Sequence, residues 1–286
     1  MGTNEGTVLV ATFVGAFGVP HVPMFADMVK REGASSETAL LFARVREAME
    51  RARPDVLVMF DTDHLNTFFF DCLPTLAIGV AESFRGPNDE PPTLEIQLVP
   101  SDPAFARHVR ASCIAGGYDL ASSESFEVDH SVMIPLHFLT PRFDVPVVPI
   151  FINGHVPPLP SARRVFEFGR KVRSAIESFP DARRVAVVGS GSFSLEVLGP
   201  RVAPGRNNGV PDPRWAEHAA ACFRDGVIAP LIVEATEARM LQAGNVAGEL
   251  LNWIAMAGAG AQRPADWIAS QSSFGHPYAV GEEAGQ

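Results

Sequence analysis

Short apolar runs alternate with amphipathic stretches along the chain. The runs TVLVATF (residues 7–13) and VLVMF (residues 56–60) have the length and the β-branched content of buried strands. Between them, residues 36–53 carry apolar side chains at helical spacing, with Ser35 or Ser36 positioned as the N-cap. A strand, a helix and a strand in this order predict a βαβ unit with two parallel, neighbouring strands.

The alternation continues toward the C-terminus. Residues 145–151 indicate a strand at a sheet edge or at a strand start, because Pro146 and Pro149 have no amide hydrogen to donate. Residues 184–189 predict another buried strand, and residues 271–286, rich in Gly, Ser and Glu, predict a loosely held tail. Helices are expected at residues 104–116, 161–179, 213–225, 227–243 and 247–259, and an edge strand at residues 94–98.

Two histidines follow the first two predicted strands. His21 lies in a loop stiffened by Pro20 and Pro23, and His64 ends the segment DTDH at residues 61–64. The carboxyl ends of neighbouring strands are where open α/β sheets place their sites. A stiff loop suits a metal ligand, which must be held before the metal arrives. Each histidine also has a simpler interpretation: His21 as a cap on a carbonyl, and His64 as part of a polar turn at a strand end.

Glu249 is a third candidate, near the start of a helix that is otherwise apolar or built from small residues. A carboxylate there either caps the helix, favoured by the helix dipole, or points into a site. Together, His21, His64 and Glu249 form a set of two histidines and one carboxylate. Such a set leaves one side of a metal open, as non-haem Fe(II) oxygenases require. The long gaps between the three residues carry no information by themselves.

Two further histidines are candidates for proton transfer. His130, in VDHS at residues 128–131, belongs to the side-chain type that exchanges protons near pH 7; its alternative is a partly buried histidine with satisfied hydrogen bonds. His155 lies in a turn and could reach the same strand ends. The run GSGSFS at residues 189–194 lacks the lysine of a P-loop and the third glycine of a dinucleotide fingerprint. The sequence contains no GxSxG elbow, which disfavours a serine hydrolase.

Composition argues against several kinds of partner. The 286 residues carry a net charge of −10 and a pI of about 5.3, so they lack the basic face that nucleic acids and anionic membranes require. Mean hydropathy is +0.10, yet no apolar run reaches the ~18 residues of a membrane helix. Residues 1–6 lack the basic and apolar regions of a secretory signal, which predicts a cytoplasmic protein. The three cysteines form no CxxC pair, so neither a zinc knuckle nor a disulfide framework is expected.

Four segments resemble those of a known family: GVPHVPMF around His21, DTDHLNTF around His64, EVDHSVMIPL around His130 and NVAGELLNWIAMAGA around Glu249. In order and context they are similar to the class III extradiol ring-cleavage dioxygenases, the superfamily of the protocatechuate 4,5-dioxygenase beta subunit. The resemblance covers about residues 8–258. It implies a single catalytic α/β domain, placed here at residues 1–270, with a central mixed β-sheet flanked by helices on both sides.

The resemblance also implies roles for these residues. His21, His64 and Glu249 would bind Fe(II), and His130 would contact the substrate and oxygen. The implied reaction opens the ring of a catechol-like or related hydroxylated aromatic and incorporates both atoms of O2. The implied partners are that small aromatic substrate and O2, with neither nucleic acid nor membrane. We also expect a homo-oligomer, and some relatives work with a small separate helical subunit that covers the site.

One position departs from the family pattern. The family has a glycine-rich strand end that closes in Leu-Ser-His, and that histidine is an acid and base outside the metal ligands. Here Leu195 takes its place. A leucine cannot accept a proton, and it makes the pocket wall apolar. Either Glu196, which we place with His130 among the catalytic residues, or His155 supplies the base. Otherwise the substrate needs no base there, or the reaction has changed.

Three alternative functions stay open. The first is a ring-opening dioxygenase for a dihydroxypyridine or an aminophenol, motivated by the change at Leu195. The second is a metal-dependent hydrolase or lyase on the same scaffold, with zinc in place of iron and turnover that is independent of oxygen. The third is a non-catalytic partner subunit or regulator. The presence of His21, His64 and Glu249 together argues against the third.

Overall fold

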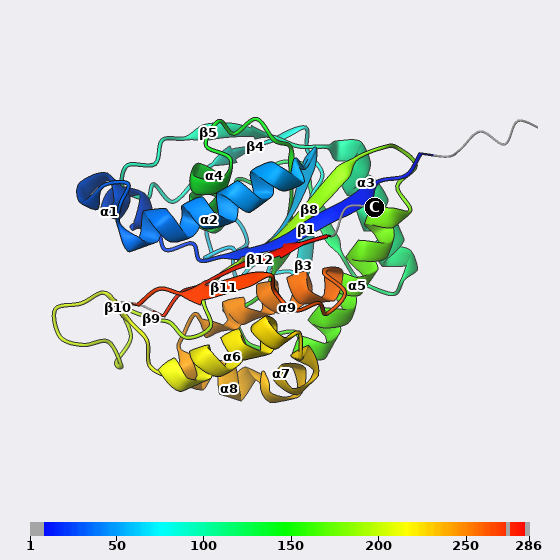
Figure 1. Cartoon of the computed structure of the whole chain (residues 1–286). Helices are drawn as coiled ribbons and strands as arrows, with labels where there is room; N and C mark the ends of the chain where they lie inside the picture. The colour runs from blue at the N-terminus through cyan, green and yellow to red at the C-terminus, as the bar shows by residue number, and fades with distance from the viewer. Residues whose placement is uncertain (1–8, 273–274, 284–286) are drawn as a thin grey trace, which may run out of the picture.

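One mixed sheet forms the centre of the molecule. The computed structural model describes residues 9–272 and 275–283, and within them eight strands pair in the order β11-β12-β1-β8-β2-β7-β3-β6 (Figure 1). These strands are β1 (Thr12–Val19), β2 (Val56–Asp61), β3 (Leu76–Gly79), β6 (Ala121–Ser123), β7 (Val147–Ile152), β8 (Arg184–Ser190), β11 (Trp267–Ser270) and β12 (Pro277–Glu282). Two short hairpins lie outside this sheet: β4 (Ser83–Gly86) with β5 (Gln97–Pro100), and β9 (Glu196–Val197) with β10 (Asn208–Gly209).

Helices cover both faces of this sheet (Figure 1). One face carries α1 (Phe25–Glu32), α2 (Glu37–Ala52) and α4 (His130–Leu139). The other carries α3 (Pro103–Ala115), α5 (Ala162–Glu177), α6 (Pro213–Asp225), α7 (Ile228–Glu234), α8 (Glu237–Ala243), the 3-10 helix η1 (Ala247–Glu249) and α9 (Leu250–Ala259). The prediction of a single α/β domain, with a central mixed β-sheet flanked by helices on both sides, is therefore confirmed.

Burial on both faces explains why the central strands read as continuous apolar runs. All six residues of β2 are buried. Val56, Val58 and Phe60 belong to the core on the α5 and α9 side, whereas Leu57 and Met59 belong to the core on the α2 side. Because successive side chains of a strand point to opposite faces, a strand covered on both sides needs apolar residues at every position.

The composition led us to expect neither a membrane-spanning helix nor a disulfide framework. In residues 9–272 and 275–283, no helix combines the length and the hydropathy needed to cross a membrane. The three cysteines are free: Cys72 is exposed, and Cys113 and Cys222 are buried.

Four strands end along the same edge of the sheet. β1 pairs with β8, β8 with β2 and β2 with β7, all in parallel registers. β8 lies between β1 and β2, so the prediction that these two strands are neighbours is wrong. The connection through α2 skips one strand position, which a later part of the chain fills. Since adjacent strands are ~4.8 Å apart, the loops after β1 and β2 still emerge within about 10 Å of each other.

β1 begins later than the apolar run that predicted it. The strand includes Gly15 and Gly18, which the sequence alone places in a loop, whereas Leu9 and Val10 of the predicted run are exposed. Residues 7 and 8 of that run lie outside the described residues. A Cβ at Gly18 would lie 2.2 Å from the Trp253 indole. This glycine therefore permits a close approach of α9 to the strand and does not mark a turn.

β7 lies inside the sheet, between β2 and β3, so the prediction of a sheet edge is wrong. The alternative, a strand start, is correct for Pro146, which directly precedes Val147. The antiparallel ladder with β3 begins at Ile150 and ends at Ile152. Pro149 precedes that ladder, so its missing amide hydrogen interrupts no pair with β3.

Most of the predicted helices are present, but one of them is divided into two in the structure. The stretch 227–243 forms α7 and α8 instead of one helix, because the Thr236 side chain caps α8 by accepting from the Arg239 amide. The predicted edge strand at residues 94–98 is the shorter β5, displaced toward the C-terminus and paired only with β4.

The C-terminal segment belongs to the sheet. β12 pairs antiparallel with β1 on one side and with β11 on the other. Tyr278 and Val280 face one core and Ala279 faces the other. The prediction of a loosely held tail at residues 271–286 is therefore wrong for β12, whose short alternating pattern the surrounding Gly and Glu residues obscure. Residues 273–274 and 284–286 lie outside the described residues.

The contact between β1 and α9 predicts the effect of one methyl group. Gly18→Ala places a Cβ inside the Trp253 ring, and we expect the free energy of unfolding to fall by about 1–3 kcal/mol because the core is overpacked. Urea titration followed by tryptophan fluorescence measures the change. Gly260→Ala is the matched control, since the nearest atom to its Cβ lies 3.4 Å away. Equal midpoints for the two variants would contradict the packing described here.

Candidate active site

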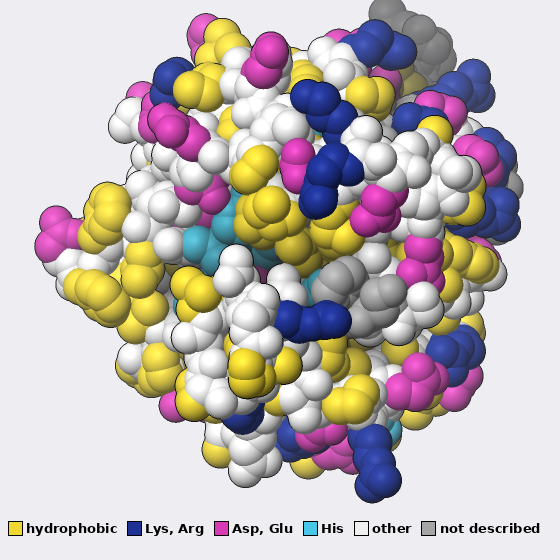
Figure 2. All heavy atoms as spheres, turned by 90° about the vertical axis from the view of Figure 1, so that its left-hand side faces the viewer, with side chains coloured by type: hydrophobic (Ala, Val, Ile, Leu, Met, Phe, Trp, Pro, Cys, Tyr) yellow, Lys and Arg dark blue, Asp and Glu magenta, His cyan; other side chains and the backbone are white. Residues whose placement is uncertain are grey.

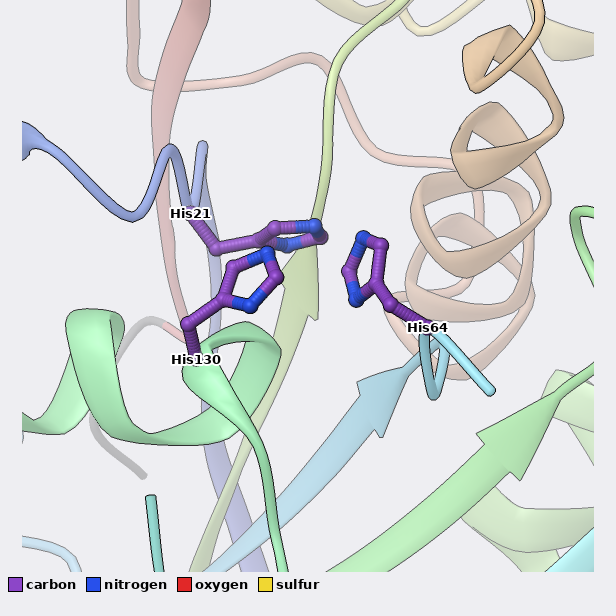
Figure 3. A group of neighbouring side chains, drawn as sticks. All are labelled: His21, His64 and His130. Carbon is purple, nitrogen blue, oxygen red and sulfur yellow. The ribbon is translucent and has the colours of Figure 1, made fainter. Parts of the chain in front are cut away.

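Four side chains from distant parts of the chain meet at the carboxyl edge of the sheet. His21 follows β1 by two residues, His64 follows β2 by three, and Glu249 ends η1. His130 is the first residue of α4. Figure 3 shows the rings of His21, His64 and His130 turned toward one another, and one ring nitrogen from each lies within 4.8 Å of the other two.

Glu249 Oε1 is the point on which the nitrogens converge. It lies 3.1 Å from His21 Nε2 and 3.4 Å from His64 Nε2. Ligand atoms ~2.1 Å from one ion lie ~3.0 Å apart at right angles and ~3.4 Å apart in a tetrahedron. Both separations fall in that range, so Glu249 Oε1 lies where it could share a metal ion with either histidine.

The other ring nitrogen of each of these two histidines is held by the protein. His21 Nδ1 lies 2.7 Å from Ser190 Oγ, and that hydroxyl donates its own hydrogen to a backbone carbonyl in α4 at 2.8 Å. Ser190 therefore accepts from His21 Nδ1. His64 Nδ1 lies 2.9 Å from Asp129 Oδ2, and a carboxylate can only accept. When neutral, both rings thus present the Nε2 lone pair to Glu249, which is the tautomer that a metal ligand needs.

Glu249 is held in the same manner. Its Oε2 accepts from the Ser192 amide at 2.9 Å, and no side-chain cap of α9 is formed, so the capping alternative does not apply. The backbone comes this close because Gly191 has φ +147, where a Cβ would lie 2.5 Å from the Glu249 Cβ. Burial alone would raise the pKa of this carboxyl, but His21 and the neighbouring imidazoles hold the pKa well below its usual value. Glu249 is therefore ionised.

His64 lies between two carboxylates. Burial lowers the pKa of its ring, but the charges and hydrogen bonds of Asp129 and Glu249 outweigh burial and raise the pKa of His64 to about 10. A cation bound at Nε2 would take the place of that proton. The same two carboxylates that stabilise the imidazolium would then stabilise the bound ion.

His130 stands beside this set. Its ring stacks on His64, with the ring centroids 4.1 Å apart. Its Nδ1 hydrogen-bonds one carboxylate oxygen of Asp89, and the other oxygen accepts from the His130 amide at 3.1 Å. Burial lowers the pKa of His130, so the ring is mainly neutral at pH 7, with its hydrogen on Nδ1. Nε2 remains available to exchange a proton.

His155 joins the cluster from the turn after β7. Its Nε2 lies 3.4 Å from Glu249 Oε1, and its ring centroid is 4.7 Å from that of His64. This Nε2 atom is buried and makes no hydrogen bond of good geometry. Of the two residues that the sequence offers in place of the family's missing histidine, His155 is the one that the structure brings to the cluster.

Glu196 is not part of the cluster, so its prediction as a catalytic residue is wrong. Its carboxylate binds the Arg201 guanidinium and accepts from the Asn245 amide at 3.0 Å. Burial raises the pKa of Glu196, but these hydrogen bonds outweigh burial and lower it, so this group is no base near neutral pH. The physical reason is that adjacent side chains of an extended segment point to opposite sides, and Leu195 is the one that faces the site.

A cavity of about 320 Å³ opens beside the cluster. His21, His64, His130 and Glu249 line one part of it. The rest is mainly what we call the apolar wall: Val22, Met24, Leu195, Val197, Leu198 and Val246. Figure 2 shows this side of the molecule, with histidine side chains visible in a hollow bordered by hydrophobic ones. The expectation that Leu195 makes the pocket wall apolar is therefore confirmed.

Sequence reasoning missed three polar residues that support the cluster. Asp129 both caps α4 and orients His64, and its position next to His130 was a readable signal. Asn252 lies three residues beyond Glu249 in an apolar helix, and its amide donates two hydrogen bonds to groups at the ends of β2 and β8. Asp89 belongs to a stretch that reads only as a surface loop, so nothing in the sequence indicated its contact with the His130 ring.

The fold and these side chains define a class: an α/β protein with two histidines and one carboxylate arranged as a candidate metal centre, and a further histidine beside a cavity. Comparison with protein families agrees with this class. The chain belongs to the family described as the catalytic LigB subunit of aromatic ring-opening dioxygenase, whose family model matches residues 15–283.

Named relatives share about a third of their aligned residues with this chain. The 2,3-dihydroxyphenylpropionate/2,3-dihydroxicinnamic acid 1,2-dioxygenase of Klebsiella pneumoniae (strain 342) is 32% identical over 184 residues, which cover 64% of this chain and 57% of the relative. The corresponding dioxygenase 2 of Pseudomonas putida is 34% identical over 187 residues, with the same coverage. The match thus spans less than two thirds of the length of these relatives.

A solved structure shares the fold. The crystal structure of an uncharacterized protein from Escherichia coli K12 superposes with a TM-score of 0.60 and covers 94% of this chain and 99% of that chain. Sequence identity is 15%, so this likeness concerns the fold alone.

The hydrogen bond from His21 to Ser190 predicts a loss of metal affinity. Ser190→Ala removes the acceptor at His21 Nδ1, so the ring is free to rotate, and we expect the affinity for a divalent metal ion to fall about tenfold or more. Anaerobic competition against a chelator of known affinity measures this. Ser174→Ala on α5 is the control, because that exposed hydroxyl binds only a carbonyl of its own helix. An unchanged affinity in Ser190→Ala would show that His21 is not held in this way.

Proposed function

We propose that this protein is a non-haem Fe(II)-dependent extradiol-type dioxygenase that opens the ring of a catechol-like aromatic with O2, with His21, His64 and Glu249 as the metal ligands. One observation carries the proposal: two histidine nitrogens lie within 3.4 Å of Glu249 Oε1, and the far atom of each of the three side chains is held by the protein. The family description and the relatives' names support the same reaction.

The ligand set is suited to the reaction because its three ligands would leave one side of the metal ion open. Fe(II) held there would acidify a bound phenolic hydroxyl and pass electrons from the ring to O2. His21, His64 and Glu249 all line the cavity, so the open side of the site faces the space where a substrate ring fits. The apolar wall excludes water from that ring and packs against it.

His130 is proposed as the residue that moves a proton at the reacting atoms. It lines the cavity, and its Nδ1 hydrogen is fixed on Asp89. Nε2 can therefore accept a proton from a substrate hydroxyl or return one to oxygen. The Asp89 carboxylate stabilises the imidazolium in between, as a carboxylate does for a general-base histidine.

His155 is proposed as a positioning residue. It contacts Glu249 Oε1 but does not belong to the residues that line the cavity, so it acts on the ligand and not on the substrate. Because Glu196 binds Arg201, we propose neither Leu195 nor Glu196 as a replacement for the family's second histidine. A substrate that needs no base at that position agrees best with this arrangement.

The proposed function is tested by oxygen uptake. Protein purified without oxygen and loaded with one Fe(II) is mixed with catechols, gallates, aminophenols and dihydroxypyridines. We expect uptake of one O2 per ring, together with a new absorbance from the opened product, for catechols. Uptake only with aminophenols or dihydroxypyridines would select the first alternative. Turnover without oxygen, sustained by zinc, would replace the proposal with the hydrolase or lyase function.

Two histidine variants separate catalysis from metal binding. His130→Gln should retain Fe(II) and lose about 10²- to 10⁴-fold in kcat, because proton transfer is removed while the ligands stay. His155→Gln should weaken Fe(II) binding about tenfold, because Glu249 loses a contact. His137→Gln is the control, since this histidine lies on α4 with His130 but away from the cavity. Loss of iron from His130→Gln, or unchanged iron affinity in His155→Gln, would contradict these roles.

The localisation and the assembly of the protein are predicted from the sequence. We propose a cytoplasmic enzyme that forms a homo-oligomer, with a small separate helical subunit as a further partner. Sedimentation of the purified protein measures the first association directly, and a monomer at all concentrations would exclude it.

A further inference from the structure

The cavity carries its titratable groups on one side only. Those groups are His21, His64, His130 and Glu249, the members of the candidate centre. The remaining lining residues are the apolar wall and four uncharged neighbours, Pro23, Ser192, Asn207 and Asn208. Within the described part of the chain, therefore, no Lys or Arg lines this space.

A negatively charged substituent on the substrate ring would be poorly stabilised here. A carboxylate that leaves water needs a paired cation or several hydrogen-bond donors, and apolar side chains supply neither. The amides of Asn207 and Asn208 offer donors without charge.

The arginine closest in sequence to the apolar wall is bound elsewhere. Arg201 follows Leu198 by three residues, but its guanidinium binds the carboxylate of Glu196 and donates to the carbonyls of Leu241 and Gln242. The charge of Arg201 is therefore paired with Glu196 and does not stabilise a carboxylate on the substrate.

From these observations we propose that the substrate is a catechol whose ring substituent is uncharged, an alkyl or aryl group that packs against the apolar wall. This inference rests on the proposed function and narrows its substrate class. It distinguishes this chain from the named relatives, whose names specify a propionate and a cinnamic acid.

A matched pair of probes isolates the charge. The acid 3-(2,3-dihydroxyphenyl)propionate and its methyl ester have the same ring and chain and differ in one negative charge. We expect the ester to bind the Fe(II)-loaded protein at least tenfold more tightly in an anaerobic titration, and to give a kcat/KM at least tenfold higher in air. Equal values, or a preference for the acid, would overturn the inference.

Two variants at one position test the mechanism of this preference. Leu198 is 79% exposed at the rim of the cavity, so it tolerates a longer side chain. Leu198→Arg should shift the acid-to-ester ratio of kcat/KM at least tenfold toward the acid. Leu198→Gln, which is polar and uncharged, should leave that ratio near the unmodified value. An equal shift in both variants would show that the wall does not discriminate by charge.

Arg206 provides a second check, because it is exposed and adjacent to the lining residue Asn207. Arg206→Ala should leave the ratio unchanged. If the unmodified protein prefers the acid and this variant loses the preference, a cation at the rim binds the carboxylate and the inference is wrong.

The anaerobic titration separates the failure of this inference from the failure of the proposed function. Tighter binding of the ester without oxygen uptake on any catechol would confirm that the cavity prefers an uncharged substituent and would overturn the proposed function. Cleavage of both probes with the acid preferred would support the proposed function and overturn the inference. If neither probe binds the loaded protein, both are wrong.

Discussion

The buried carboxylate of Glu249 is the constraint on which the rest of the site depends. An ionised carboxylate with 2% exposure is stable only where the protein surrounds it with positive charge or hydrogen-bond donors. Here the surrounding groups are the imidazoles of His21, His64 and His155 and the backbone amide of Ser192. They follow β1, β2, β7 and β8, so one carboxylate gathers the ends of four parallel strands. The order of the sheet and the geometry of the centre are therefore determined together.

The adjacent side chains of Leu195 and Glu196 point to opposite sides of one extended segment and have different contacts. Leu195 faces the cavity and removes a polar group from its wall, whereas Glu196 faces away and binds Arg201. Both effects lower the polarity of the space beside the candidate centre. In a space of low polarity, the hydrogen bond between His130 and Asp89 is stronger than it would be in water, so the His130 ring is held more firmly.

The sequence predicted the residue types of the centre better than the path of the chain around them. Buried strands such as β2 and capped helices such as α2 follow from local pattern, and the four motif segments placed His21, His64, His130 and Glu249 in one site. Three things did not follow. Pro149 lies inside the sheet because only its β2 side is paired at that position, β12 is obscured by the Gly and Glu residues around it, and Asp89 approaches His130 only through tertiary packing. Local propensity contains no information on any of these contacts.

The pairing of β12 with β1 has a consequence for synthesis on the ribosome. His21 lies 228 residues ahead of Glu249 in the chain, and β1 lies still further ahead of its antiparallel partner β12. During synthesis, the imidazoles of His21 and His64 are therefore present long before the carboxylate of Glu249. Two neutral ligands without the carboxylate hold a divalent ion weakly, since they supply no charge to compensate it. In the proposed ligand set, the late position of Glu249 would thus delay metal capture until β1, β2, β7 and β8 have all been synthesised.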